Sequence, residues 1–199
     1  MKKGHEGKLF VISGPSGVGK GTLRARALEG FDDLVYSISC TTRPPREGER
    51  EGMDYRFISE QEFLERVRQG QFLEYARVHG AFYGTLRSDV ERDLAAGLDV
   101  LLEIDVQGAL QVKQLLPSQA ILIFVSPPSV EELERRLRWR HTETEDKIRV
   151  RIANAKEELL QADKYDHVVL NDDLFRAAEE LKNIIYEYRG KVGIKSEIL

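Results

Sequence analysis

The clearest chemistry in this sequence lies in a short run near the N-terminus, Gly14-Pro15-Ser16-Gly17-Val18-Gly19-Lys20-Gly21-Thr22. The run has the spacing of a phosphate-binding loop, which is a glycine, four residues and then Gly-Lys. Its glycines permit a tight turn in which backbone N–H groups and a helix N-terminus surround a polyphosphate. Lys20 would reach the β and γ phosphates. The run therefore predicts a nucleotide ligand, and the alternative is an ordinary Gly-rich turn with an exposed lysine.

The loop departs from the usual pattern after the lysine. Gly21 stands where a serine or threonine normally ligates Mg²⁺, and the hydroxyl of Thr22 comes one position later. Either Thr22 substitutes, or the ion is held mainly by phosphates and water. We favour the second arrangement, because Mg²⁺ tends to keep its water shell.

A second group of residues indicates another phosphate site. Arg43 and Arg46 lie three apart in a loop stiffened by Pro44 and Pro45. A planar guanidinium binds a phosphate through two parallel hydrogen bonds, so the pair suits a phosphate group. Taken alone, the same residues more often form a solvated charged loop than a phosphate site.

Both groups need elements to position them, and the chain alternates between apolar runs and helical patterns. We expect strands over residues 8–13, 36–39, 72–78, 99–105, 120–125 and 167–170. We expect helices over residues 20–28, 59–70, 88–97, 106–116, 129–139, 145–163 and 172–189. Capping boxes predict the helix starts at Ser59, Ser88 and Ser129, and Asp172 is expected to cap the last helix. This alternation is typical of βαβ units, so the predicted fold class is α/β with a parallel sheet.

Composition limits the possible functions. The 199 residues carry a net charge of −4, which disfavours a nucleic-acid or membrane-surface binder. The single cysteine, Cys40, excludes an internal disulfide and a Cys-rich zinc site. The four histidines show no metal-ligand spacing, so no protein-ligated metal is expected. The apolar run 9–12 is too short for a signal peptide or a membrane span, and we expect a cytoplasmic protein.

Several motifs together resemble those of the guanylate kinases. They are the phosphate loop, the run from Ser39 to Glu49 with its Thr-Thr-Arg-x-Pro-Arg core, Tyr83-Gly84-Thr85, the Leu-Glu-Ile-Asp run with Gln107-Gly108, and the run 169–173. They occur in the family's order from about residue 9 to residue 188. The resemblance implies a parallel sheet flanked by helices as in P-loop NTPases, a GMP-binding insert and a helical lid. It implies one domain over 1–199, with a core at 7–38 and 98–190, the insert at 39–97 and a lid at about 137–150.

The resemblance also implies roles for individual residues. Phosphate-binding residues for GMP would be Arg43, Arg46, Tyr55 and Tyr83, and residues at the guanine would be Ser39, Glu74, Thr85 and Asp105. The ATP site would comprise Gly14, Pro15, Ser16, Gly17, Val18, Gly19, Lys20, Gly21, Thr22 and Asn171. Catalytic residues would be Lys20 and Arg43 with the lid arginines Arg136, Arg140 and Arg151.

Elementary chemistry supports the choice of guanine. Its Watson–Crick edge offers N1–H and a 2-amino group as donors and O6 as an acceptor, and a carboxylate only accepts. A pair of acids therefore prefers guanine to adenine. Glu103, where the family usually has aspartate, would share a strand face with Asp105. For Glu74, the plain alternative is a solvent-facing residue on an alternating strand.

Six arginines lie within residues 135–151. Some must form a solvated helix face paired with neighbouring glutamates, and we assign Arg135, Arg138 and Arg149 to that role.

The predicted reaction is ATP + GMP = ADP + GDP, with dGMP as a further acceptor, ATP and Mg²⁺ as the donor pair and nucleotides as the only partners. Monomer and homo-oligomer remain equally open. Two alternatives are a P-loop kinase for another phosphate-bearing substrate and a non-catalytic protein-binding module of the same fold. Loss of the guanine contacts would mark the first, and a degraded phosphate loop would mark the second.

Overall fold

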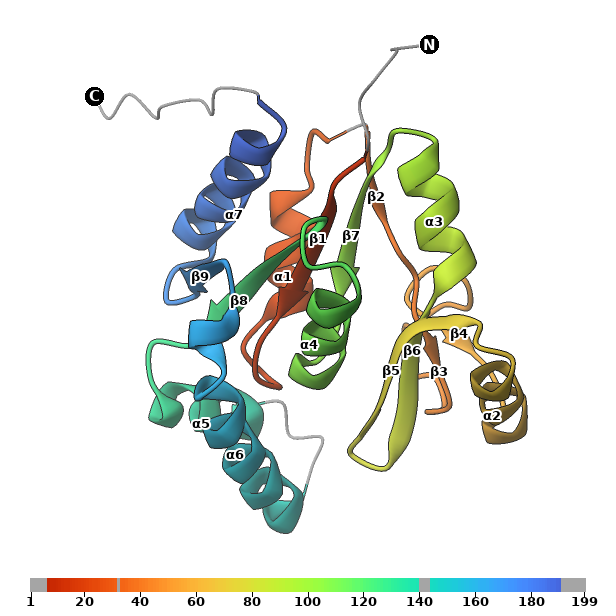
Figure 1. The fold of residues 1–199 in the computed structure, drawn as a ribbon. Coiled ribbons are helices and arrows are strands. Elements are labelled where there is room, and N and C mark those ends of the chain that lie inside the picture. Colours follow the sequence, from red (N-terminus) through yellow and green to blue (C-terminus); the bar gives the residue numbers. More distant parts are fainter. Residues whose placement is uncertain (1–6, 32, 140–143, 191–199) are drawn as a thin grey trace. The chain divides into compact units, whose positions relative to one another are not determined.

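A computed structural model describes residues 7–31, 33–139 and 144–190 of the chain (Figure 1). The larger sheet has the strand order β2-β7-β1-β8-β9. Its strands are β1 (Leu9–Ser13), β2 (Leu34–Tyr36), β7 (Asp99–Glu103), β8 (Ala120–Ser126) and β9 (His167–Leu170). The pairs β2–β7 and β8–β9 are parallel, which confirms the predicted α/β class with a parallel sheet. Every residue of β1 is buried, as a continuous apolar run predicts for a central strand.

A second sheet has the order β4-β3-β6-β5. Its strands are β3 (Cys40–Thr41), β4 (Arg56–Phe57), β5 (Phe72–Val78) and β6 (Ala81–Leu86). Cys40, Phe63, Phe72 and Leu86 form a buried cluster beside it. The hairpin β5–β6 is irregular near its start, because Phe72 pairs with Leu86 while Glu74 pairs with the next residue back, Thr85. Leu73 is therefore the extra residue of a β-bulge.

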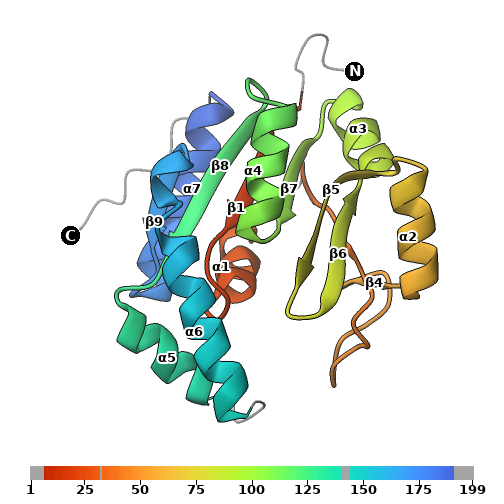
Figure 2. The ribbon, with the colours of Figure 1, turned by 60° about the horizontal axis from the view of Figure 1, so that its bottom comes forward.

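The helices connect these strands (Figure 2). They are α1 (Lys20–Ala27), α2 (Glu60–Arg68), α3 (Arg87–Ala95), α4 (Val106–Leu115), α5 (Val130–Trp139), α6 (Glu145–Leu159) and α7 (Leu174–Tyr188), with a 3₁₀ turn η1 (Ala162–Lys164). Two of the predicted caps are confirmed, since Ser59 accepts from the Glu62 N–H and Ser129 from the Glu132 N–H.

Two predicted caps are wrong, because the N-cap of α3 is Leu86, two residues before Ser88, and that of α7 is Asp173, one residue after Asp172. Helix α3 begins at Arg87 and not at Ser88, because β6 runs directly into it and the Arg87 N–H donates to the Gln71 carbonyl. The cap of α7 is Asp173, whose carboxylate accepts from the Arg176 N–H, whereas Asp172 pairs with the Arg176 guanidinium.

Two predicted strands also differ from the structure. Residues 37–39 are not a strand, because the chain there leaves β2, with its last bond from the Ser37 N–H to the Leu101 carbonyl, and enters the second sheet at Cys40. Strand β7 ends at Glu103, and Asp105 is the N-cap of α4. The argument that Glu103 and Asp105 share a strand face therefore does not hold.

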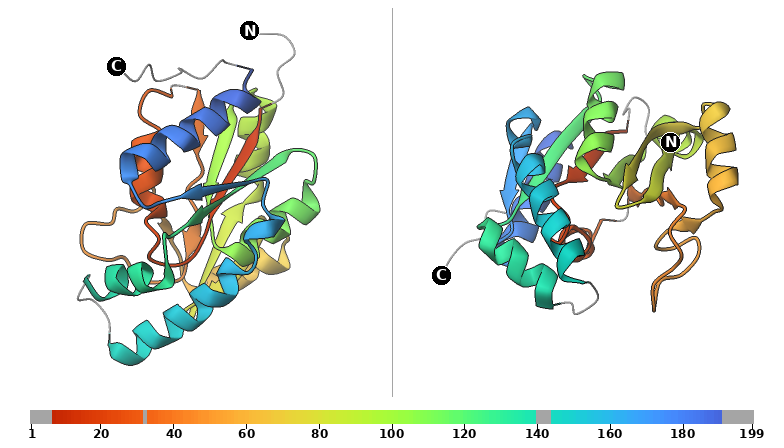
Figure 3. Two further views of the ribbon diagram at one scale, coloured as in Figure 1. Left: turned by 90° about the vertical axis from the view of Figure 1, so that its left-hand side faces the viewer. Right: turned by 90° about the horizontal axis from the view of Figure 1, so that it is seen from below.

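The chain divides into two compact units, one comprising residues 1–11 and 33–121 and the other residues 12–32 and 122–199. In the second unit, α1 packs on α7, and α5 packs on α6 (Figure 3). In the first unit, α4 packs on β5. Within the described ranges, no helix combines the length and the apolar character that a membrane crossing requires.

Candidate functional site: two nucleotide-binding half-sites

The phosphate loop of the second unit lies between β1 and α1, as its motif requires. Gly14 has φ 145°, and a Cβ there would lie 2.3 Å from the Val125 carbonyl oxygen, so only glycine fits. Gly19 is the N-cap of α1 and makes no side-chain cap bond. The Lys20 ammonium donates to the carbonyls of Gly14 and Pro15, at 2.6 and 3.3 Å. The Lys20 side chain therefore lies over the phosphate loop.

Asn171 and Arg136 both donate hydrogen bonds to the Val18 carbonyl of the phosphate loop. The Asn171 side-chain amide donates to the Val18 carbonyl at 2.7 Å, and Asn171 is 6 % exposed. The Arg136 guanidinium donates to the same carbonyl at 3.3 Å and to the Asn171 carbonyl at 3.0 Å. Glu132, one helical turn earlier in α5, accepts from Arg136 Nε at 2.8 Å. The structure thus brings two residues that are far apart in sequence onto the phosphate loop.

The other arginines of this region are the predicted lid residues Arg140 and Arg151 and the three that we assign to a solvated helix face. Arg151, on α6, donates to the Ser16 hydroxyl of the phosphate loop at 3.4 Å. Arg140 lies outside the described residues. The three arginines assigned to a solvated helix face all pair with glutamates of α5 or α6: Arg135 with Glu132, Arg138 with Glu134 and Glu145, and Arg149 with Glu145.

In the first unit, Arg43, Glu49, Tyr55 and Tyr83 form a cluster, which we call the phosphate cluster after the ligand predicted for it. Arg43 Nε donates to the Tyr83 hydroxyl at 3.2 Å. Its guanidinium lies over the Tyr55 ring, 5.4 Å from the centroid, and the Tyr55 and Tyr83 rings meet edge to face. Burial raises the pKa of Tyr55 to about 12, and the nearby Glu103 charge adds to this effect. Tyr55 therefore keeps its proton at neutral pH and can donate it to a phosphate oxygen.

Glu49 belongs to the sequence motif without a role predicted from it, and the structure gives it one. Its carboxylate accepts two bonds from the Arg43 guanidinium, both at 2.9 Å, and a third from the Arg46 N–H at 2.7 Å. Burial opposes its charge, but these donors lower the pKa of Glu49 below its usual value. The Arg46 side chain is exposed beside this group.

An acid pair, Glu74 and Asp105, lies at the other predicted end of the ligand. Glu74 is 3 % exposed, and its Oε1 accepts from the Thr85 hydroxyl at 2.7 Å. Burial raises the pKa of Glu74 to about 7, the Thr85 bond opposes that rise, and the Asp105 charge adds to it. Asp105 caps α4, with Oδ1 accepting from the N–H groups of Gln107 and Gly108 at 2.7 and 3.2 Å.

The bulge at Leu73 explains why Glu74 is buried. Regular alternation would direct neighbouring side chains to opposite faces, yet Phe72, Leu73 and Glu74 are all buried. A bulge redirects the side chains that follow it, and bulges are common beside functional sites. The solvent-facing alternative for Glu74 is therefore wrong. Ser39, the remaining predicted base contact, is 5 % exposed and directly precedes β3.

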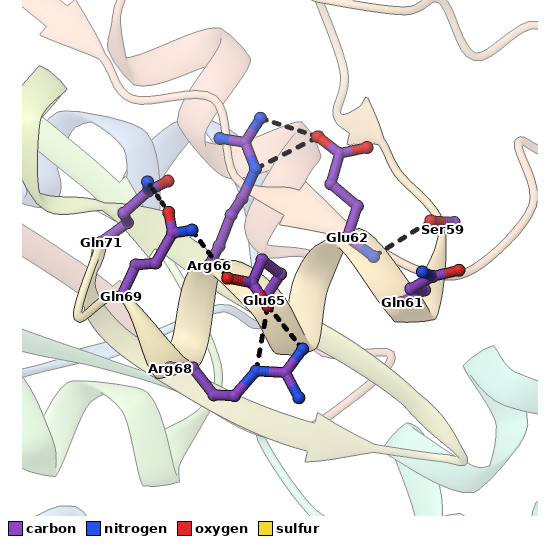
Figure 4. A pocket seen from close by; sticks show the side chains of 8 residues that line it. All are labelled: Ser59, Gln61, Glu62, Glu65, Arg66, Arg68, Gln69 and Gln71. Carbon is purple, nitrogen blue, oxygen red and sulfur yellow. Dashed lines mark hydrogen bonds and ion pairs between the residues drawn. The ribbon is translucent and has the colours of Figure 1, made fainter.

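A separate hollow of about 480 Å³ lies along α2 (Figure 4). Its lining is polar and largely paired within the helix, with Arg66 bonded to Glu62 and Arg68 to Glu65. It contains none of the residues of either predicted site. We interpret it as a solvated helix face.

Comparison with known proteins gives a consistent result. The family model described as "Guanylate kinase" matches residues 6–188. A guanylate kinase of Thermotoga maritima is 50 % identical over 187 residues, covering 94 % of this chain and 90 % of that protein. A guanylate kinase of Thermus thermophilus is 50 % identical over 197 residues, covering 99 % of this chain and 87 % of that protein. The crystal structure of guanylate kinase from Anaplasma phagocytophilum superposes with a TM-score of 0.79 at 33 % identity, over 96 % of this chain and 89 % of that one.

Proposed function

This chain belongs to the guanylate kinase family, whose reaction is ATP + GMP = ADP + GDP, and we propose that the two half-sites bind the two nucleotides of that reaction. The chain is an ATP-dependent nucleoside monophosphate kinase. One observation supports the GMP half-site above all. Tyr83 and Thr85 are two residues apart on β6; Tyr83 belongs to the phosphate cluster and accepts from Arg43, whereas Thr85 donates to Glu74 of the acid pair. Their side chains lie on one face, about 6.7 Å apart along the strand, so one element serves both ends of a nucleotide.

In this proposal, the phosphate cluster and Arg46 bind the GMP phosphate. Arg43 and Arg46 supply charge, and the hydroxyls of Tyr55 and Tyr83 donate to phosphate oxygens. The acid pair accepts from the guanine N1–H and 2-amino groups, while Ser39 and Thr85 present hydroxyls to the remaining polar atoms of the base. The contacts to base and phosphate do not use the 2′-hydroxyl, so dGMP is a second acceptor, although it lacks any further bond that a ribose hydroxyl can make.

The second unit binds ATP. Residues 14–22 surround the phosphates with backbone N–H groups, Lys20 lies on the β and γ phosphates, and Asn171 fixes the loop near the adenine side. Arg136, Arg140 and Arg151 neutralise charge on the transferring phosphoryl group. In this assignment, residues 39–97 form the GMP-binding insert, residues 137–150 form a lid, and residues 7–38 and 98–190 form the core of one catalytic domain.

The acceptor is a phosphate oxygen that is largely ionised near neutral pH, so the chain needs no general base. Its residues act by positioning the two nucleotides in line and by neutralising charge. Closure of the lid and the insert over both nucleotides would exclude water that would otherwise hydrolyse ATP. We place the enzyme in the cytoplasm, in purine nucleotide metabolism and GMP recycling.

The reaction also implies Mg²⁺, and the residues of the loop fit a loosely held ion. Thr22 is an exposed residue on the first turn of α1, and the described residues contain no cluster of three acidic, His or Cys side chains suited to a metal. The ion would take its ligands mainly from phosphates and water. When bound, it adds positive charge that stabilises the transferring group.

A coupled assay of ADP release tests the proposal, with ATP and Mg²⁺ and with GMP, dGMP, AMP, CMP or UMP in turn. We expect strong turnover with GMP, less with dGMP, and none above background with the other three. Equal turnover with AMP and GMP would contradict the assignment of the acid pair to guanine.

A further inference from the structure

We propose that Gly108 is a specificity-determining residue, because its missing side chain lets Glu74 lie beside Asp105 in the arrangement that guanine requires. The inference rests on the proposed GMP site. Gly108 lies in the first turn of α4 and contacts both acids. Its N–H donates to Asp105 Oδ1 at 3.2 Å, and a Cβ on it would lie 2.3 Å from Glu74 Oε2 and 3.0 Å from Glu74 Cδ. Real Cβ atoms essentially never come within 3.0 Å of another atom, so the overlap with Glu74 Oε2 must be relieved.

The overlap must be relieved by the Glu74 carboxylate and not by the helix. Helix α4 is tied to β5 by a pair of bonds, in which Gln111 donates to the Tyr75 carbonyl at 2.9 Å and accepts from the Tyr75 N–H at 3.3 Å. Asp105 caps the same helix. The Glu74 carboxylate is the end of a side chain and can rotate, although doing so breaks or bends its bond to Thr85. A methyl group at Gly108 therefore changes the position of one acid and leaves the other in place.

Displacement of Glu74 affects recognition of the base and has little effect on the fold. In each carboxylate, one oxygen accepts hydrogen bonds from the protein. Oε1 of Glu74 accepts from the Thr85 hydroxyl, and Oδ1 of Asp105 accepts from N–H groups at the start of α4. A carboxylate has about four acceptor positions, so each acid retains capacity for a ligand N–H. Guanine offers its donors in a fixed planar pattern, and the two acids match it only at one spacing. Displacement of Glu74 removes the means of recognising the 2-amino group or N1–H.

The test uses Gly108→Ala in the full chain, with GMP and IMP as acceptors. IMP lacks the 2-amino group, so the ratio of kcat/KM for GMP to that for IMP measures recognition of that group. We expect kcat/KM for GMP to fall about tenfold, chiefly through KM, and the GMP-to-IMP ratio to fall about fivefold. The KM for ATP and the thermal midpoint should stay close to the wild-type values. An unchanged ratio would overturn the inference.

Gln111→Ala is the matched control, because it loosens α4 from β5 without adding an atom near Glu74. It should lower the thermal midpoint and leave the GMP-to-IMP ratio unchanged. If the ratio falls equally in both variants, Gly108 has only a structural role and the inference is wrong. A wild-type enzyme that does not prefer GMP to IMP would instead contradict the proposed function itself.

A double-mutant cycle keeps the test valid if Gly108→Ala folds poorly. Glu74→Asp shortens the acid by one methylene and withdraws it from the position of the new methyl group. In that background, Gly108→Ala should fold and change kcat/KM for GMP by less than about twofold. If the substitution is equally damaging with Asp and with Glu at position 74, Glu74 is not the group that Gly108 accommodates.

Discussion

The Arg43 guanidinium and the Glu49 carboxylate meet in a bidentate pair, with both N–O distances at 2.9 Å. A guanidinium has five N–H donors. Glu49 takes two of them, the Pro44 carbonyl takes one at 2.7 Å, and the Tyr83 hydroxyl takes Nε at 3.2 Å. The end of the guanidinium is thus engaged by the protein. These bonds use four of the five donors, so the second N–H of Nη2 is the one that remains for a ligand, and Glu49 orients it.

Glu49→Gln should therefore raise the KM for GMP about tenfold and leave kcat and the KM for ATP nearly unchanged. An amide can accept only one of the two paired bonds and lacks the charge, and bonds between charged groups contribute about 1.5–3 kcal/mol each. Initial-rate kinetics at saturating ATP would measure the effect. Glu47→Gln, in the same exposed loop, is the control for loss of a negative charge alone. A lower KM in Glu49→Gln would mean that Glu49 competes with the phosphate.

Glu74 should make GMP capture sensitive to pH. Because burial raises its pKa to about 7, the free enzyme loses the carboxylate charge as the pH falls through 7. The ionised form accepts from guanine, so kcat/KM for GMP should fall below pH 7. A profile from pH 5 to 9 would show this limb. The GMP phosphate itself titrates at about pH 6, and the limb that it causes should persist in Glu74→Gln while the limb at pH 7 disappears.

The same residue should affect stability in the opposite direction. The folded pKa lies above the usual value of 4.5, so the contribution of Glu74 to folding is fully present below pH 4.5 and is lost as the pH rises through 7. We would measure the free energy of unfolding of Glu74→Gln and of the wild type by urea titration without nucleotide. The value for Glu74→Gln minus the value for the wild type should increase between pH 4.5 and 8. A constant difference across that range would show that Glu74 has an ordinary pKa.

Lys20 and Arg43 should separate chemistry from acceptor binding. Lys20→Ala should abolish turnover while calorimetry shows nearly intact GMP binding, because Lys20 belongs to the ATP half-site. Arg43→Ala should weaken GMP binding, because it removes the centre of the phosphate cluster. If both variants lose turnover and GMP affinity to the same extent, the division of roles is wrong.

Asn171→Ala should weaken the phosphate loop. The substitution removes the shorter of the two bonds to the Val18 carbonyl and leaves only the Arg136 bond at 3.3 Å, and one such hydrogen bond contributes about 0.5–1.5 kcal/mol of stability. We expect a lower thermal midpoint and a higher KM for ATP, with GMP binding unchanged. Asn183→Ala, on an exposed position of α7, is the matched control and should leave both quantities close to the wild type.

The sequence predicts most of this fold because its signals are local. The phosphate loop, β5, β9 and two serine caps depend on residues close together in the chain. The bulge at Leu73 depends on the pairing of β5 with β6, two strands that bury a shared face, and no alternation within β5 indicates it. The start of α3 depends on a bond to the distant Gln71 carbonyl, and so the nearby Ser88 is a misleading signal.

The candidate site shows the same division. Motif resemblance predicts Arg43 and Glu74, but the partners that fix their geometry come from tertiary contacts. Glu49 gains its role only when the loop folds back on Arg43, and Gly108 gains its role only when α4 packs on β5. The types and spacing of residues in the sequence indicate neither the distance between Glu49 and Arg43 nor the distance between Gly108 and Glu74.

The placement of Tyr83 and Thr85 on one strand has a consequence for affinity. Guanosine can engage only the acid pair, and inorganic phosphate only the phosphate cluster, so each is half of a ligand. Joined in one molecule, the second half binds at the high effective concentration set by the covalent link, with little further loss of translational freedom. Strand β6 thereby turns two weak affinities into one strong affinity, and selects molecules in which base and phosphate are covalently connected.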